Sequence, residues 1–279
     1  MSNIFDIKRF GRYIVSDLKQ CIANFGISFL LLTFMGVIIY AGTTITGLLL
    51  NSTWNGPGIV FRAITFGVCL TILVITMPGK CYGYITDKKS GSLYLMVPAS
   101  TLEKFLSMVI MMVVVFPSLF LLGYLGTDFL LCSVDKTCGE AIIRVGGIIS
   151  EEIKELNEAS LLAITETIKR PILYIDDIIG IITLFLMGSV IFRKHKVAYT
   201  LLAALAFSMV TSTITAPLML GDMAFLMNPE IMNDTDTAAA LISASSTLSN
   251  ISVIDTVNDL ILITGTLAGT YWRLKTLKF

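Results

Sequence analysis

The chain has 279 residues, of which 55% are hydrophobic and only 14% are charged, and its formal net charge is zero. Soluble globular domains carry about 25% charged residues, so this composition excludes an ordinary soluble domain. A neutral chain also has no overall positive field that would attract nucleic acid. We therefore predict an all-α polytopic membrane protein, with most of its length in transmembrane helices.

The N-terminal segment, residues 1–26, precedes the first long apolar stretch. It places Lys8, Arg12 and Lys19 between apolar residues at a near-helical spacing. This pattern is typical of an amphipathic helix that lies along the membrane interface, with its basic residues among anionic headgroups. We expect such an interfacial helix here, and a frayed polar tail is the alternative.

Six stretches of the sequence are apolar over the roughly 20 residues that a helix needs to cross the hydrocarbon core of a bilayer. The six predicted spans are residues 27–50, 59–78, 105–131, 172–192, 197–220 and 251–272. Each is expected to be helical, because lipid offers no hydrogen-bond partner to an exposed backbone group.

Basic residues predict which ends of the spans face the cytoplasm. About 14 of the 20 lysines and arginines fall in the N-terminal segment, in the loop 79–104, in the turn 193–196 and in residues 273–279. Six spans put all four of these segments on one side of the membrane. Because short basic loops stay in the cytoplasm, both ends of the chain are expected there.

Two longer segments are expected on the opposite side. Residues 132–171 carry many glutamates among isoleucines and leucines, so we predict a small amphipathic helical cap. Cys132 and Cys138 begin this cap, on the side of the membrane where disulfides persist; a disulfide and two unpaired thiols both stay open. Residues 221–250 form either a surface loop or a pair of short helices that re-enter the membrane.

The cytoplasmic loop 79–104 carries the most informative pattern in the chain. Ser100 and Glu103 match a capping box, which predicts that a helix begins here and runs directly into the third span. Pro98, just before it, marks a break in the backbone. The apolar run 93–97 lies in a loop that water should surround, and such a run indicates a contact surface. The alternative is that this run packs against the bilayer or against neighbouring helices.

The order of these features resembles the corresponding loop in the permease subunits of ABC-2 type ABC transporters, especially small exporter permeases of Bacteroidota-type bacteria. The features that carry the resemblance are Gly91-Ser92, Leu93-Tyr94-Leu95-Met96-Val97, Pro98-Ala99-Ser100 and Glu103-Lys104-Phe105. In that family this loop contains the coupling helix that docks into the ATP-binding subunit, and an amphipathic connecting helix precedes the first span. The residues that the resemblance implies for docking are Lys88, Lys89, Leu93, Tyr94, Leu95 and Met96.

The resemblance also implies a function, a location and partners. The chain would be the permease of an ATP-driven exporter in the bacterial inner membrane, surrounded by lipid and paired with a second permease as a homodimer or heterodimer. No Gly-x-x-x-x-Gly-Lys-Ser/Thr phosphate loop occurs in the sequence, so ATP and Mg²⁺ would be bound by a separate ATP-binding subunit. The chain itself is then expected to be a transport subunit without a cofactor, not an enzyme.

Two other functions compete with transport. One is a non-catalytic membrane scaffold or a subunit of a sensing complex, which nothing in the sequence excludes. The other is a membrane enzyme, which would need nucleophiles, acid–base pairs or metal ligands that converge at one site. The only cluster of this kind is a pair of aspartates in the sixth predicted span, and no metal-ligand spacing occurs. An enzyme is therefore the weaker alternative.

These aspartates are candidates for function, because ionisable residues inside a span are costly. Asp255 and Asp259 lie four residues apart and so share one helix face, with Asn258 beside them. We expect both aspartates to be buried, because a span that began after them would be too short to cross the bilayer. They then either line a substrate path or pair with Arg62.

The sixth predicted span also contains Gly265 and Gly269, again four residues apart. Small residues at this spacing let two helices approach closely. The second helix belongs either to the same chain or to the other permease of a dimer. The motif is common enough that packing within the chain is the favoured use.

Overall fold

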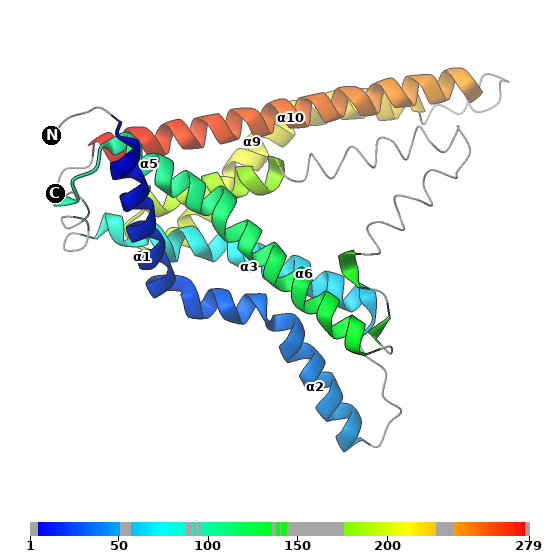
Figure 1. The fold of residues 1–279 in the computed structure, drawn as a ribbon. Helices are drawn as coiled ribbons and strands as arrows, with labels where there is room; N and C mark the ends of the chain where they lie inside the picture. The colour runs from blue at the N-terminus through cyan, green and yellow to red at the C-terminus, as the bar shows by residue number, and fades with distance from the viewer. Residues whose placement is uncertain are drawn as a thin grey trace.

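The computed structural model describes residues 5–50, 57–87, 91, 94, 96–135, 138–139, 141–143, 176–226 and 237–276. Within these ranges the chain is almost entirely helical and no residue forms a β-strand, which confirms the all-α prediction for this part. Figure 1 shows a bundle of long helices, in which α1 begins and α10 finishes at the same end of the molecule.

Helix α1 (Ile7–Thr33) begins after Asp6, whose side chain accepts the backbone N–H of Lys8 at 2.9 Å. Its buried residues recur every four positions and so form one face. These residues are Tyr13, Asp17, Cys21 and Phe25. Within residues 7–26 the helix is two-sided as predicted, whereas its position along the membrane interface stays a prediction. In Figure 1 the dark-blue N-terminal part of α1 crosses the end of the bundle steeply instead of running along it.

The predicted first span, residues 27–50, is not one helix. Helix α1 runs past residue 26 to Thr33, and α2 (Met35–Leu49) follows after a break at Phe34. The Thr33 hydroxyl donates to the carbonyl of Phe29 at 2.9 Å. Bonds of this kind often bend helices, but Thr65, Thr71 and Thr76 make the same bond inside α3, which continues without interruption.

The helix that contains the third predicted span begins at the capping box, as the sequence predicted. Before it, α3 (Ile59–Tyr82) ends in the short 3₁₀ helix η1 (Gly83–Thr86). After the loop, α5 (Thr101–Val109), the π-helical η2 (Ile110–Val115) and α6 (Phe116–Val134) follow one another without a break. The Ser100 hydroxyl accepts the N–H of Glu103 at 3.2 Å, and the Glu103 carboxylate accepts the N–H of Ser100 at 2.8 Å. These two bonds confirm the predicted capping box.

The π-helical stretch has a local cause in the sequence. Pro117 lies in the first turn of α6, directly after η2. Proline has no backbone N–H, so the regular hydrogen bond to the preceding turn is missing there. A single wide turn next to such a position is a common way for a long helix to continue.

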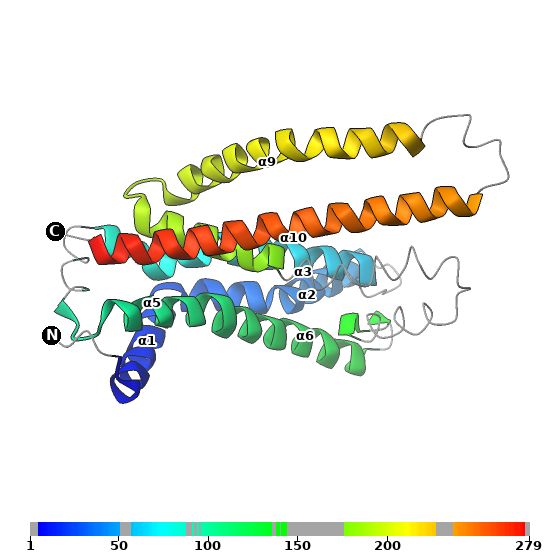
Figure 2. The ribbon, with the colours of Figure 1, turned by 90° about the horizontal axis from the view of Figure 1, so that it is seen from above.

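The described residues of the C-terminal half, 176–226 and 237–276, form three further helices. Residues 176–191 form the first, and it falls within the predicted span 172–192. Helices α9 (Lys196–Leu226) and α10 (Thr237–Thr276) contact each other, and Figure 2 shows them extending together from the bundle. The backbone of 221–226 therefore belongs to α9 and that of 237–250 to α10. With 40 residues, α10 is about 60 Å long, which exceeds the hydrocarbon thickness of a bilayer.

Four helical segments of the described residues are long and apolar enough to cross a membrane. They are Ile7–Thr33, Ile59–Thr86, Thr101–Val134 and Lys196–Thr213. The apolar part of α2, Met35–Gly47, is shorter. The chain is therefore a helical membrane protein with several candidate spans. Most of the predicted cap, from residue 144 to 171, lies outside the described residues.

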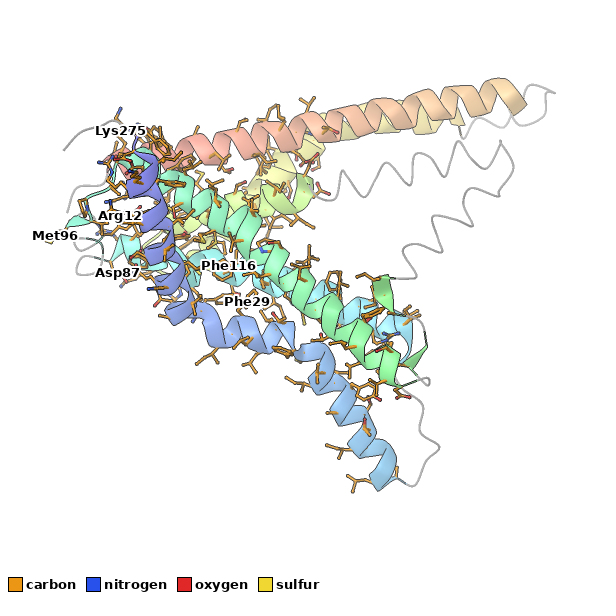
Figure 3. The ribbon with its side chains drawn as sticks, viewed as in Figure 1. Arg12, Phe29, Asp87, Met96, Phe116 and Lys275 are labelled. Atoms are coloured by element: carbon orange, nitrogen blue, oxygen red, sulfur yellow. The ribbon has the colours of Figure 1, made fainter. Side chains whose placement is uncertain are left out.

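The buried core lies between α1, α3 and the continuous helix from α5 to α6. Leu73, Met77 and Met112 are fully buried there. Phe29 of α1 meets Phe116 edge-on, with ring centroids 5.6 Å apart, and Figure 3 labels this pair inside the bundle. Helix α10 packs against α5 and α9, so the two halves of the chain meet near the start of α5.

We predict that Gly123→Ala destabilises the contact between α1 and α6. A Cβ atom at Gly123 would lie 2.5 Å from Cγ2 of Thr33, and overpacking of this kind costs about 1–3 kcal/mol. Thr33→Ser removes Cγ2 but keeps the hydroxyl, so it should restore most of the lost stability in the double variant. Unfolding in detergent measures both effects. Equal stability of Gly123→Ala and the unchanged protein would show that the helices are not in this close contact.

Candidate functional site

The end of the bundle where α1 begins gathers side chains from four separate parts of the chain. Arg12 comes from α1, Asp87 from the residue after η1, Met96 from the loop before α5, and Lys275 from the last turn of α10. Figure 3 labels these four residues at this one end. We call this region the loop end of the bundle.

A buried carboxylate joins the first residues of α1 to the start of α5. The Glu103 side chain is fully buried, and Arg9 clamps it with Nε 2.9 Å from Oε2 and Nη2 2.6 Å from Oε1. The backbone N–H of Asp6 donates to Oε1 at 3.0 Å, and the capping bond from Ser100 reaches Oε2. Bidentate, charge-assisted bonds are among the strongest polar contacts in proteins. The start of α1 is therefore fixed to the start of α5.

The loop before α5 is held by a second basic residue. Lys104 is buried, donates Nζ to the carbonyl of Tyr94 at 2.7 Å and lies 4.6 Å above the centre of the Tyr94 ring. The Tyr94 ring also meets Tyr84 edge-on. Burial raises the pKa of Tyr94 well above its ordinary value, so this phenol is neutral at physiological pH. Between these anchors and Ser100, Met96 is 72% exposed.

Asp17 makes a corresponding connection about two turns further along α1. It is 3% exposed, and its Oδ2 accepts the hydroxyl of Tyr82 at 2.8 Å and that of Ser107 at 2.6 Å. The three residues belong to α1, α3 and α5. A fourth element is tied in by Lys196, at the start of α9, which donates to the carbonyl of Gly83 in η1. The loop end is thus cross-linked by polar contacts among five elements.

The predicted docking residues fall into three groups. Lys88, Lys89, Leu93 and Leu95 lie outside the described residues. Tyr94 is buried against Tyr84 and Lys104, so it supports the loop from inside. Met96 points outward into the surroundings (Figure 3). The docking role of this segment stays a prediction, with Met96 as its accessible apolar side chain.

The aspartates of the sixth predicted span lie on α10. Asn258 and Asp259 are half-buried, while the side chain of Asp255 lies outside the described part. Their role in a substrate path stays a prediction. Arg62, the alternative partner, is paired with Asp128 of α6, with Nη1 2.6 Å from Oδ1.

The Arg62–Asp128 pair is the centre of a network at the end of the bundle opposite the loop end. Both side chains are buried. Asp128 accepts the N–H of Ile142 at 2.9 Å, and Arg62 donates to the carbonyl of Cys138 at 3.0 Å and to Sγ of Cys132 at 2.8 Å. The two cysteine sulfurs lie 2.7 Å apart as thiols. Cys132 and Cys138 are therefore neighbours, as a disulfide would require, and the formation of that disulfide stays a prediction.

The two glycines of α10, Gly265 and Gly269, have different surroundings. A Cβ atom at Gly269 would lie 3.1 Å from Sδ of Met187, which belongs to helix 176–191 of the same chain. A Cβ atom at Gly265 would meet no described atom within 4 Å. Close packing at Gly269 is therefore within the chain, while a dimer contact at Gly265 stays a prediction.

Sequence reasoning missed three charged residues that organise the structure: Asp17, Lys104 and Asp128. Asp128 lies inside the predicted span 105–131, so its position within an apolar segment was the signal. Asp17 and Lys104 lie in segments where charges are expected at the surface. The partners of Asp17 are 65 and 90 positions away, so its local sequence does not indicate burial, and Lys104 bonds to a backbone carbonyl ten residues earlier, which no side-chain pattern marks.

The part of the chain that the structure describes holds no group of three or more histidine, cysteine or acidic residues that could bind a metal. Comparisons with protein-family models, with curated proteins and with solved structures give no match to the chain. The function of the loop end is therefore inferred from its own contacts.

We predict that Arg62 and Asp128 stabilise the fold only when both are present. Arg62→Met and Asp128→Leu each leave one buried charge without its partner, which typically costs about 3–5 kcal/mol. The double variant removes both charges and should be more stable than either single variant. Unfolding in detergent gives the three free energies. Strictly additive losses would mean that the two side chains do not interact.

Proposed function

We propose that the chain is the permease subunit of an ATP-driven ABC transporter, of the exporter kind, coupled to a separate ATP-binding subunit. In this proposal the chain has six spans, keeps both ends in the cytoplasm and works as a dimer in the bacterial inner membrane. The loop end is the face that meets the ATP-binding subunit. ATP and Mg²⁺ belong to that partner, which supplies the energy of hydrolysis.

The observation that carries the proposal is the exposure of Met96, whose backbone is helical, in a segment between α3 and α5 that is anchored on both sides. Met96 is 72% exposed and belongs to the apolar run 93–97, and a run of apolar residues exposed together would mark a contact surface. Just before Met96, Tyr94 is held by Lys104. Just after it, Ser100 and Glu103 begin α5 and are clamped by Arg9. A displacement of this segment therefore also displaces the helices to which it is anchored.

These contacts suggest how movement would pass from a partner to the membrane helices. Displacement of the segment 94–100 shifts Glu103, and Arg9 then carries the shift to α1. The same displacement moves α5, which continues through η2 into α6. The helices that would be displaced first are thus α1 and the helix from α5 to α6. This route fits a permease that changes access to a central path when its ATPase closes.

The charges of the loop end support the proposed orientation. Arg12, Arg193, Lys194 and Lys275 are all exposed. Figure 2 shows the turn between helix 176–191 and α9 at the same end as the last turn of α10. Basic residues next to spans favour the cytoplasmic side, where an ATP-binding subunit would be found.

The proposal predicts that a stoichiometric ATPase with a phosphate loop purifies with the tagged chain. The test is purification from the native host in mild detergent, followed by mass spectrometry. Met96→Glu should reduce the retained ATPase by at least about tenfold, because an unpaired charge at a buried contact is strongly unfavourable. Met96→Leu, which keeps an apolar side chain of similar size, is the matched control and should retain the ATPase.

Two outcomes would contradict the proposal. A chain that purifies alone, or only with proteins that lack a phosphate loop, would favour the scaffold or sensing-complex alternative. Equal retention of the ATPase by Met96→Glu and Met96→Leu would place the contact elsewhere on the chain. The melting temperature of each variant shows whether the fold is intact.

A further inference from the structure

A cavity of about 350 Å³ lies beside α1, next to the loop that precedes α5. Tyr13, Asp17, Tyr84 and Tyr94 form its inner wall, and Ser16 and Gln20 of α1 line its outer, exposed side. Its volume is at the lower end of the range for small-ligand sites. Asn24 of α1 and Val97 complete the lining, so the wall combines three phenols and one carboxylate with three exposed polar side chains and one apolar side chain.

Asp17 lines the cavity, and one oxygen of its carboxylate has no described donor. Both donors that reach the carboxylate, Tyr82 and Ser107, bond to Oδ2. No described donor bonds to Oδ1, and no described cation lies within ion-pair distance of this residue. A buried carboxylate is costly unless it is paired and hydrogen-bonded, so a ligand with a positive charge would satisfy it.

The Tyr94 hydroxyl is a second, independent indication. Tyr94 is 5% exposed and lines the cavity, and its hydroxyl makes no hydrogen bond of ordinary geometry in the described part of the chain; the Tyr13 hydroxyl, on the same cavity wall, is the described group that interacts with it. Buried hydroxyl groups almost always have a hydrogen-bond partner. The nearby Lys104 does not serve this purpose, because its ammonium group bonds to the Tyr94 carbonyl.

We propose that this cavity binds an organic ammonium group. Its N–H bonds would be accepted by Oδ1 of Asp17 and by the Tyr94 oxygen, and its charge would lie against the faces of the tyrosine rings. Aromatic rings attract cations in this way, and walls of several aromatic residues are used to bind alkylammonium ligands. An anion would be repelled by Asp17, and a neutral ligand would leave that charge unpaired.

Two sources can supply this group: the ethanolamine headgroup of a phospholipid, or a small free amine. Binding would lock α1 to the loop before α5. The inference does not depend on the proposed transport function.

The test uses the full chain, purified and delipidated in detergent. Phosphatidylethanolamine, phosphatidylglycerol with the same acyl chains, and ethanolamine hydrochloride are the three probes. Thermal unfolding and native mass spectrometry read out binding. Asp17→Asn keeps an oxygen for Tyr82 and Ser107 but removes the charge, and Tyr94→Phe removes only the hydroxyl. Asp177→Asn changes an exposed aspartate and is the matched control.

We expect phosphatidylethanolamine to bind and to raise the melting temperature, and phosphatidylglycerol to do neither at this site. Asp17→Asn should weaken this binding by at least about tenfold, as the loss of a charge-assisted bond does, and Tyr94→Phe by a smaller factor. Asp177→Asn should bind normally. Binding of free ethanolamine with the same dependence on Asp17 would assign the site to soluble amines as well, whereas its absence would assign the site to lipid.

The proposal is overturned if the two lipids bind equally. It is also overturned if binding of the ammonium probes is unchanged in both Asp17→Asn and Tyr94→Phe. Should Asp17→Asn fail to fold, Tyr94→Phe decides, because that variant leaves the network of Asp17, Tyr82 and Ser107 intact.

Discussion

The Glu103 carboxylate is fully buried and accepts hydrogen bonds from the Arg9 guanidinium and from the backbones of Asp6 and Ser100. A carboxylate in such a place is stable only while these donors surround it. The requirement fixes three things at once: the position of the start of α1, the first turn of α5 and the end of the loop between α3 and α5. Asp17 repeats the arrangement with hydroxyl donors from α3 and α5.

The two acids explain why the N-terminal part of α1 lies across the end of the bundle. An amphipathic helix without specific partners would be free to slide along the membrane interface. Here Arg9 and Asp17 lie eight residues apart, so about two turns of α1 are anchored at separate points. The proposed ammonium site lies beside the second anchor, and Tyr94 and Val97, on either side of Met96 in the chain, line the same cavity. Contacts from a partner protein and from a bound amine would therefore act on the same joint between α1 and α5.

Local patterns in the sequence predicted several of these elements correctly. The capping box at Ser100 needs only residues three positions apart, and the apolar stretches identify a helical membrane protein by composition. The break at Phe34 was not predicted, because hydropathy is continuous across it. The pairs Arg9–Glu103 and Arg62–Asp128 join residues 94 and 66 positions apart. Such pairs depend on how helices pack, which the spacing of residues along one helix does not reveal.

The central claim is that Glu103 and Arg9 act together to hold α1 to α5. The most direct measurement is a double-mutant cycle with Arg9→Met and Glu103→Gln, read out as the unfolding transition in detergent. If the two residues depend on each other, each single variant is less stable than the unchanged protein, and the double variant is no less stable than the worse of the two. Losses that simply add in the double variant would contradict the account, because α1 would then be held at its start by other contacts.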